Sequence, residues 1–100
     1  MKRIVAYVPD LMDRSKVAAA ATDVTFVAKP ADLAGAVADL VVVDATRPGA
    51  VEAIKDVAAP VIAFSKHTNR EAMDAALAAG ADQVLARSAF FSRLDDLLGG

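Results

Sequence analysis

The chain has 100 residues, a length that suits a single domain (residues 1–100) around one core. Its net charge of −2 argues against a nucleic-acid partner, and the absence of cysteine excludes disulfides and thiolate metal sites. No apolar run approaches the roughly 18 residues that a membrane span requires. The N-terminal apolar run meets Pro9 and Asp10 too early for a signal peptide. We therefore expect a soluble, cytoplasmic domain without a membrane partner.

Five short apolar runs indicate β-strands at residues 4–8, 24–28, 40–43, 61–64 and 83–86. Each run is almost continuously apolar, which is typical of strands buried on both faces of a parallel sheet. Alanine supplies 24 of the residues counted in the 56% hydrophobic fraction, so helices can approach this sheet closely.

Helical stretches separate the strands. The first begins at Asp10 and Asp13 and runs to residue 21, and two short ones follow at 31–38 and 51–57. The fourth has a capping box of Thr68 and Glu71 and a stop at Gly80. The last begins near Ser88 and carries one apolar stripe of Phe90, Phe91, Leu94, Leu97 and Leu98. This alternation predicts a three-layer α/β/α sandwich with right-handed crossovers and shortened second and third helices.

Polar side chains follow four of the five strands. They are Asp10, Asp44, Ser65 with Lys66 and His67, and Arg87 with Ser88. Open α/β sheets bind ligands at the carboxyl ends of their strands, so a carboxylate, a hydroxyl and a guanidinium are expected to meet at one edge.

These residues resemble those of response-regulator receiver (CheY-like) domains. The segment VVVDATRPG resembles the family's D-x-x-x-P-G after its third strand, and APVIAFS resembles its fourth strand with a terminal hydroxyl residue. AALAAGADQVLARS resembles the helix-AGA-strand segment that follows, and Ser65 and Gly80 have the separation usual in that family. The resemblance implies a flavodoxin-like, five-stranded parallel sheet of order 2-1-3-4-5.

The resemblance also implies roles for individual residues. Asp44 matches the phosphoacceptor position, Ser65 matches the hydroxyl that contacts the phosphoryl group, and Arg87 stands where the family has a lysine. A cofactor is not required unless Asp44 is phosphorylated. In that case Mg²⁺ would use oxygen ligands, with Asp10 and Asp44 as the candidates.

The chain departs from the family pattern at several of these positions. Where the family has a pair of adjacent acids at the end of the first strand, this chain reads Tyr7-Val8-Pro9-Asp10, so at most one acid remains. Where the family has its lysine, this chain has Arg87, and the next residue is Ser88 in place of the family's proline. Val84 stands at the position of the family's aromatic switch residue on the fifth strand.

Each site residue also has a structural interpretation. Asp44 fits the start of a Thr-Arg-Pro-Gly turn, with Arg47 or Arg87 as its ion-pair partner. Asp10 fits a helix N-cap, Ser65 a strand-end hydroxyl, and the lone His67 a solvated loop residue. A hydrolase triad is not favoured because FSKH is not a G-x-S-x-G elbow, and no dinucleotide or P-loop motif occurs.

We therefore expect a stand-alone pseudo-receiver, not an enzyme, that signals through protein–protein interaction without conventional Mg²⁺-dependent phosphotransfer. Its partner would be a histidine kinase or another signalling or regulatory protein, and a homodimer is compatible with the fold. One alternative is a functional single-domain response regulator phosphorylated on Asp44. A second is a small flavodoxin-like enzyme or ligand-binding subunit, because many functions share this architecture.

Overall fold

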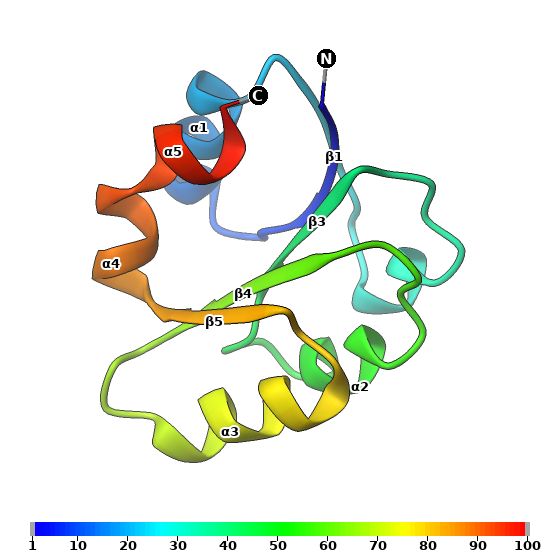
Figure 1. The fold of residues 1–100 in the computed structure, drawn as a ribbon, viewed down its shortest axis with the longest axis vertical. Helices are drawn as coiled ribbons and strands as arrows, with labels where there is room; N and C mark the ends of the chain where they lie inside the picture. The colour runs from blue at the N-terminus through cyan, green and yellow to red at the C-terminus, as the bar shows by residue number, and fades with distance from the viewer. Residues whose placement is uncertain (1, 100) are drawn as a thin grey trace.

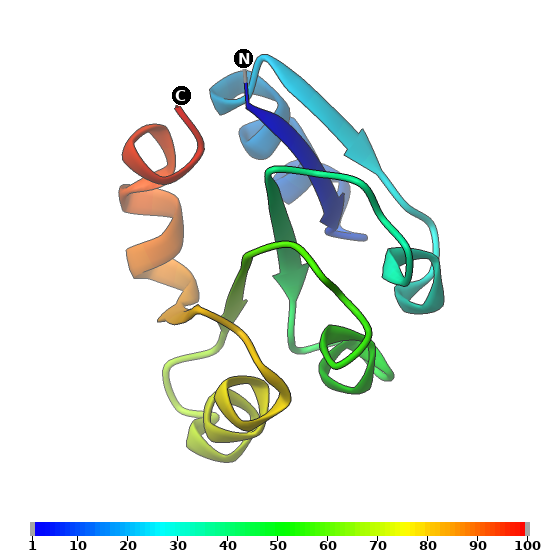
Figure 2. The same cartoon turned by 45° about the vertical axis from the view of Figure 1, so that its right-hand side comes forward.

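A computed structural model describes residues 2–99 and contains one parallel sheet of five strands (Figures 1 and 2). Their bounds are β1 Arg3–Tyr7, β2 Asp23–Phe26, β3 Leu40–Asp44, β4 Val61–Ser65 and β5 Gln83–Ala86. The strand order is β2-β1-β3-β4-β5. The prediction of a flavodoxin-like sheet of order 2-1-3-4-5 is thus confirmed.

The two central strands β3 and β4 are the most buried part of the sheet. Every residue of β3 and β4 is buried, whereas the edge strands β2 and β5 are mostly half-buried. In the register between these central strands Asp44 lies opposite Phe64. The carboxylate of Asp44 therefore lies at the carboxyl end of β3, in the most buried part of the sheet.

Helices cover both faces of the sheet (Figure 2). The helices α1 Leu11–Ala20, α4 Arg87–Ser92 and α5 Leu94–Leu98 pack on one face, where Val17, Phe90 and Leu98 join the core. The 3₁₀ helix η1 Pro30–Leu33, α2 Ala50–Ile54 and α3 Arg70–Ala79 cover the other face. The three-layer sandwich is confirmed, and no helix in residues 2–99 has the length and apolar character to cross a membrane.

The crossover between β2 and β3 differs from the helix expected at 31–38. It forms the four-residue η1, which ends at Ala34, and Gly35 follows with φ of 75°. Only Leu33 of η1 is buried, so too little apolar surface is available to stabilise a longer helix. Helix α2 is likewise shorter than the expected 51–57 and ends at Ile54. The helical segments of the β2–β3 and β3–β4 crossovers are therefore short, as predicted, but that of the β2–β3 crossover is a 3₁₀ helix and not an α-helix.

Two other helix boundaries correct the sequence prediction. The cap of α3 is Asn69 and not Thr68, because the Asn69 side chain accepts the backbone N–H of Ala72 at 3.1 Å. The stop at Gly80 is confirmed, with φ of 117°. The single C-terminal helix is instead two helices that meet at Arg93, whose backbone (φ −109°, ψ 16°) leaves the helical region.

Candidate functional site

Asp44 is held by the turn that follows it. Its Oδ1 accepts the backbone N–H of Thr46 at 3.0 Å and the Thr46 hydroxyl at 2.5 Å. Its Oδ2 faces the Nε of Arg47 at 3.4 Å. The Asp44 side chain is 3% exposed, so these groups replace water around the carboxylate. Of the two arginines that the sequence offers as partners, Arg47 is the one that pairs with Asp44.

Asp10 caps the first helix. Its Oδ1 accepts the backbone N–H groups of Met12 and Asp13 at 2.9 and 3.0 Å, which confirms the N-cap interpretation. The N–H of Asp13 is the main cause that holds the pKa of Asp10 below its ordinary value of 3.8. Desolvation opposes this shift, while the N–H of Met12 and the positive charges of Arg87 and Arg47 add to it.

The acid pair expected after β1 is replaced by an anchored loop. Val8 is fully buried, and its carbonyl oxygen accepts the Arg14 Nε–H at 2.9 Å. The Arg14 guanidinium also lies over the Phe26 ring at 5.2 Å. The segment between β1 and α1 is thus fixed by the burial of Val8 and by the contacts of Arg14, and Asp10 is its one carboxylate.

Arg87 pairs with Asp13 and not with Asp44. Its Nη1 donates to Oδ2 of Asp13 at 2.6 Å, and its Nη2 donates to Oδ1. Asp13 is 1% exposed. The bond to Asp13 is the main cause that raises the pKa of Arg87, and the charges of Asp44 and Asp10 add to it. Arg87 therefore stays cationic and links the beginning of α1 to the end of β5.

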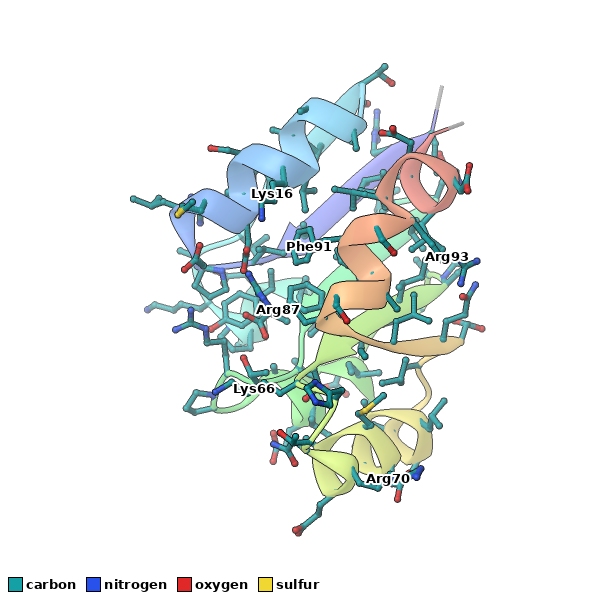
Figure 3. All side chains as sticks on the ribbon, turned by 90° about the vertical axis from the view of Figure 1, so that its left-hand side faces the viewer. Lys16, Lys66, Arg70, Arg87, Phe91 and Arg93 are labelled. Carbon is teal, nitrogen blue, oxygen red and sulfur yellow. The ribbon has the colours of Figure 1, made fainter. Side chains whose placement is uncertain are left out.

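Aromatic rings hold Arg87 in place (Figure 3). The guanidinium carbon lies 4.9 Å from the centre of the Phe91 ring and 6.0 Å from that of Phe64. Phe91 also contacts Lys16 of α1, whose Nζ lies 5.2 Å from the ring centre. Such cation–π contacts and the bidentate bond restrict Arg87 to one orientation, which suits a planar guanidinium better than an ammonium group.

Ser65 lies at the end of β4, next to Ala86 of β5 in the sheet register. Its side chain is fully buried, and its Oγ has no hydrogen-bond partner among the described residues. The structure thus brings Asp10, Asp44, Ser65 and Arg87 to the same edge of the sheet, where their strands end. It gives each of the two acids a partner in the protein and leaves the hydroxyl of Ser65 without one.

The carboxylates at this edge are already bound to groups of the chain itself. Mg²⁺ takes near-octahedral oxygen ligands, usually one or two carboxylates together with waters and phosphate oxygens. Within residues 2–99, no group of three or more His, Asp or Glu side chains is arranged to hold a metal ion. Asp13 is bound to Arg87, Asp44 is bound to Thr46 and Arg47, and Asp10 caps α1. The positive charge at this edge comes from guanidinium groups of the chain itself.

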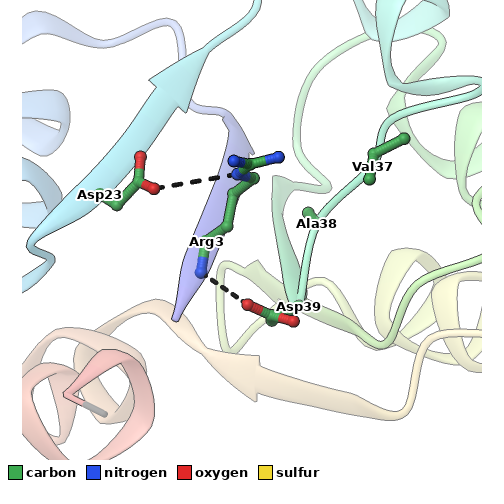
Figure 4. Close-up of a pocket in the computed structure, with 5 residues that line it drawn as sticks. All are labelled: Arg3, Asp23, Val37, Ala38 and Asp39. Carbon is green, nitrogen blue, oxygen red and sulfur yellow. Dashed lines mark hydrogen bonds and ion pairs between the residues drawn. The ribbon is translucent and has the colours of Figure 1, made fainter. Parts of the chain in front are cut away.

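A separate hollow of about 410 Å³ lies at the amino end of the sheet (Figure 4). The backbone N–H of Arg3 donates to Asp39 at 2.8 Å, and its Nε lies 3.9 Å from Asp23. These contacts join the start of β1 to the starts of β2 and β3. The polar residues that line this hollow therefore hold the amino ends of the strands together, and the hollow lies at the opposite end of the sheet from Asp44.

Two residues of the site were not singled out from the sequence. Thr46 supplies two hydrogen bonds to Asp44, and Asp13 is the partner of Arg87. The signal for Asp13 was its spacing: it lies four residues before the buried Val17, hence on the face of α1 that packs on the sheet. A carboxylate on a buried helix face requires a cationic partner.

No protein-family model matches this sequence, and no curated protein sequence matches it. Solved structures do match. A response regulator from Hahella chejuensis is 20% identical with a TM-score of 0.80, over 98% of this chain and 92% of that one. The BeF3-activated DrrB receiver domain is 18% identical with a TM-score of 0.77, over 100% and 99%. A CheY-like response regulator from Mesorhizobium loti is 21% identical with a TM-score of 0.71, over 95% and 93%.

At these identities the likeness establishes the fold. It covers nearly the whole chain, and the five-stranded sheet of order β2-β1-β3-β4-β5 agrees with it. The chain therefore has the fold of response-regulator receiver domains.

Proposed function

We propose that this chain is a pseudo-receiver: a cytoplasmic signalling module that acts through protein–protein interaction, without conventional Mg²⁺-dependent phosphotransfer and without enzymatic activity. Its partner is a histidine kinase or another signalling protein. The receiver fold supports a role in signalling, and the state of the carboxylates at the end of the sheet supports the loss of phosphotransfer.

One observation carries this proposal: guanidinium groups neutralise both buried carboxylates. Arg87 binds Asp13 through two hydrogen bonds, and Arg47 lies beside Asp44. Phosphoryl transfer to a carboxylate depends on positioning and on neutralising the incoming negative charge. In this chain Asp44 has both oxygens engaged and little exposed surface, so a phosphoryl donor would have to displace Thr46 and Arg47.

Small-molecule phosphorylation tests the proposal. The wild-type chain is incubated with acetyl phosphate and Mg²⁺, and its intact mass is followed over time beside that of Asp44→Asn. We expect neither protein to gain a phosphoryl group. A gain in the wild type that is absent from Asp44→Asn would contradict the proposal.

Ser65 favours the alternative of a response regulator phosphorylated on Asp44. Its buried Oγ has no partner among the described residues, and a buried hydroxyl without a hydrogen bond is costly. A phosphoryl oxygen would provide a partner, as the resemblance to receivers implies. The mass experiment separates the two hypotheses because the alternative requires the gain at Asp44.

A further inference from the structure

A groove between η1 and α2, on the face of the sheet opposite α1, has no role in the site described above. It is an open, shallow hollow of about 510 Å³, and its apolar surface comes from Pro30, Ala31, Pro48 and Ala53. We call it the η1–α2 groove. Its lining residues come from η1, from α2 and from the residues that flank these two short helices.

The walls of this groove are fixed by backbone chemistry. Pro30 begins η1 and Pro48 precedes α2, and both have restricted backbone torsions. Gly49 lies between the two walls with φ of 81° and no side chain. A Cβ atom at this position would lie 3.6 Å from Cγ of Pro30. That distance is an ordinary van der Waals contact, so the positive φ at this position, and not a lack of space, favours glycine.

The charges at the groove are unequal. Glu52 of α2 and Asp56, which follows the end of α2 at Ile54, both line it. Both side chains are exposed, and neither has an ion-pair partner in the part of the chain that the structure describes. A second hollow of about 410 Å³ shares Pro48, Gly49 and Glu52 and adds the carboxylate of Glu71 and the guanidinium of Arg47. Lys29 is the cation of the groove and belongs to η1.

We propose that the η1–α2 groove binds a basic segment of a partner protein. This segment carries an apolar side chain and, within one helical turn of it on either side, a lysine or arginine. The apolar side chain lies against Pro30, Pro48 and Ala53. The cation pairs with Glu52 and Asp56, and Lys29 repels it, which fixes the direction of the segment. This binding uses apolar contact for affinity and charge for orientation.

The inference rests on the proposed function, because it assigns a partner chemistry to a protein-interaction module. It uses residues other than Asp44, Ser65 and Arg87. If the groove did not bind the segment, the result of the phosphorylation test would not be affected. A positive phosphorylation test would in turn leave binding at the groove measurable.

Amide NMR with a defined peptide tests this proposal. The probe is a short amphipathic peptide of leucine, alanine and lysine, titrated into the isotope-labelled full chain. The comparison peptide has glutamate in place of every lysine. We expect saturable shifts at residues 29–31 and 48–56 with the basic peptide and none at these positions with the acidic one.

Variants of both kinds of contact complete the test. Glu52→Gln with Asp56→Asn should weaken binding on the order of threefold to tenfold, as expected for two exposed ion pairs. Asp95→Asn with Asp96→Asn changes the net charge equally at exposed residues of α5 and should leave the affinity unchanged. Ala31→Trp, at an exposed position, should obstruct the groove and abolish the shifts.

Three results would overturn the proposal. They are saturable shifts confined to other surfaces, equal binding of the two peptides, and equal weakening by the α5 control pair. The amide spectrum of each variant also reports whether it is folded, so a loss of binding in a folded variant can be assigned to the groove.

Discussion

Arg87, at the start of α4, binds both carboxylate oxygens of Asp13, in the first turn of α1, although the two residues are 74 positions apart. The pair joins the first and the last thirds of the chain at the edge where the strands end. It places a permanent positive charge beside a buried carboxylate. The local charge is thus balanced without an added cation.

Replacing Arg87 by methionine should destabilise the fold. The methionine keeps the apolar contacts with Phe91, but Asp13, which is 1% exposed, is left buried without its cation. The free energy of unfolding should fall by about 2–4 kcal/mol, measured by urea denaturation. Arg93→Met is the matched control, since Arg93 is exposed and has no ion pair among the described residues. Equal effects of the two changes would contradict the role given to the Asp13 pair.

Removing Asp44 should also destabilise the protein. Asp44→Ala leaves the N–H and hydroxyl of Thr46 without their acceptor, and we expect a loss of about 1–2 kcal/mol, since Thr46 and Arg47 are exposed and water partly replaces the contact. Asp44→Asn keeps an acceptor for Thr46 and should lose less. If Asp44 instead belonged to a group of unpaired carboxylates that repel one another, removing its charge would raise the free energy of unfolding. Stabilisation by both changes, in thermal or urea unfolding, would refute the turn function of Asp44.

The hydroxyl of Ser65 should contribute nothing to stability. Its Oγ is buried and has no partner among the described residues, so Ser65→Ala removes a desolvated polar atom with almost no change in volume. We expect a free energy of unfolding that is unchanged or higher by up to about 1 kcal/mol. A loss above about 1 kcal/mol would show that the hydroxyl has a hydrogen-bond partner in solution.

The N-cap of α1 should respond to acid. Because the backbone N–H groups of Asp13 and Met12 hold the pKa of Asp10 below 3.8, its stabilising effect is complete above pH 3.8. The effect is lost as the pH falls from 3.8 through the lower pKa of the folded state. Asp10→Asn caps the helix without titrating and should remove this contribution from the pH dependence of unfolding. A pKa above 3.8 for Asp10, measured by NMR titration, would contradict the cap geometry.

The sheet could be predicted because each strand is a compact apolar run bounded by polar or turn residues. Asp10 could also be assigned to its cap, since an aspartate before a helix has few other local partners. Both predictions use information within a few residues of chain. The strand order came from the resemblance and the structure confirms it.

The remainder depended on contacts between distant residues. Whether Asp44 pairs with Arg47 or Arg87 is decided by Asp13, which lies on another element and takes Arg87. The helix expected at 31–38 is absent because only Leu33 of η1 finds a buried position. The break at Arg93 lets Leu94, Leu97 and Leu98 all be buried, a packing result that the regular apolar spacing did not predict.

The most direct test of the central claim, that this receiver fold lacks Mg²⁺-dependent phosphotransfer chemistry, is an NMR titration with Mg²⁺ and beryllofluoride, a mimic of the phosphoryl group. Amide shifts are followed in the wild type and in Asp44→Ala. We predict no saturable shifts around Asp44 and Ser65 in either protein. Saturable shifts at these residues in the wild type that disappear in Asp44→Ala would contradict the claim.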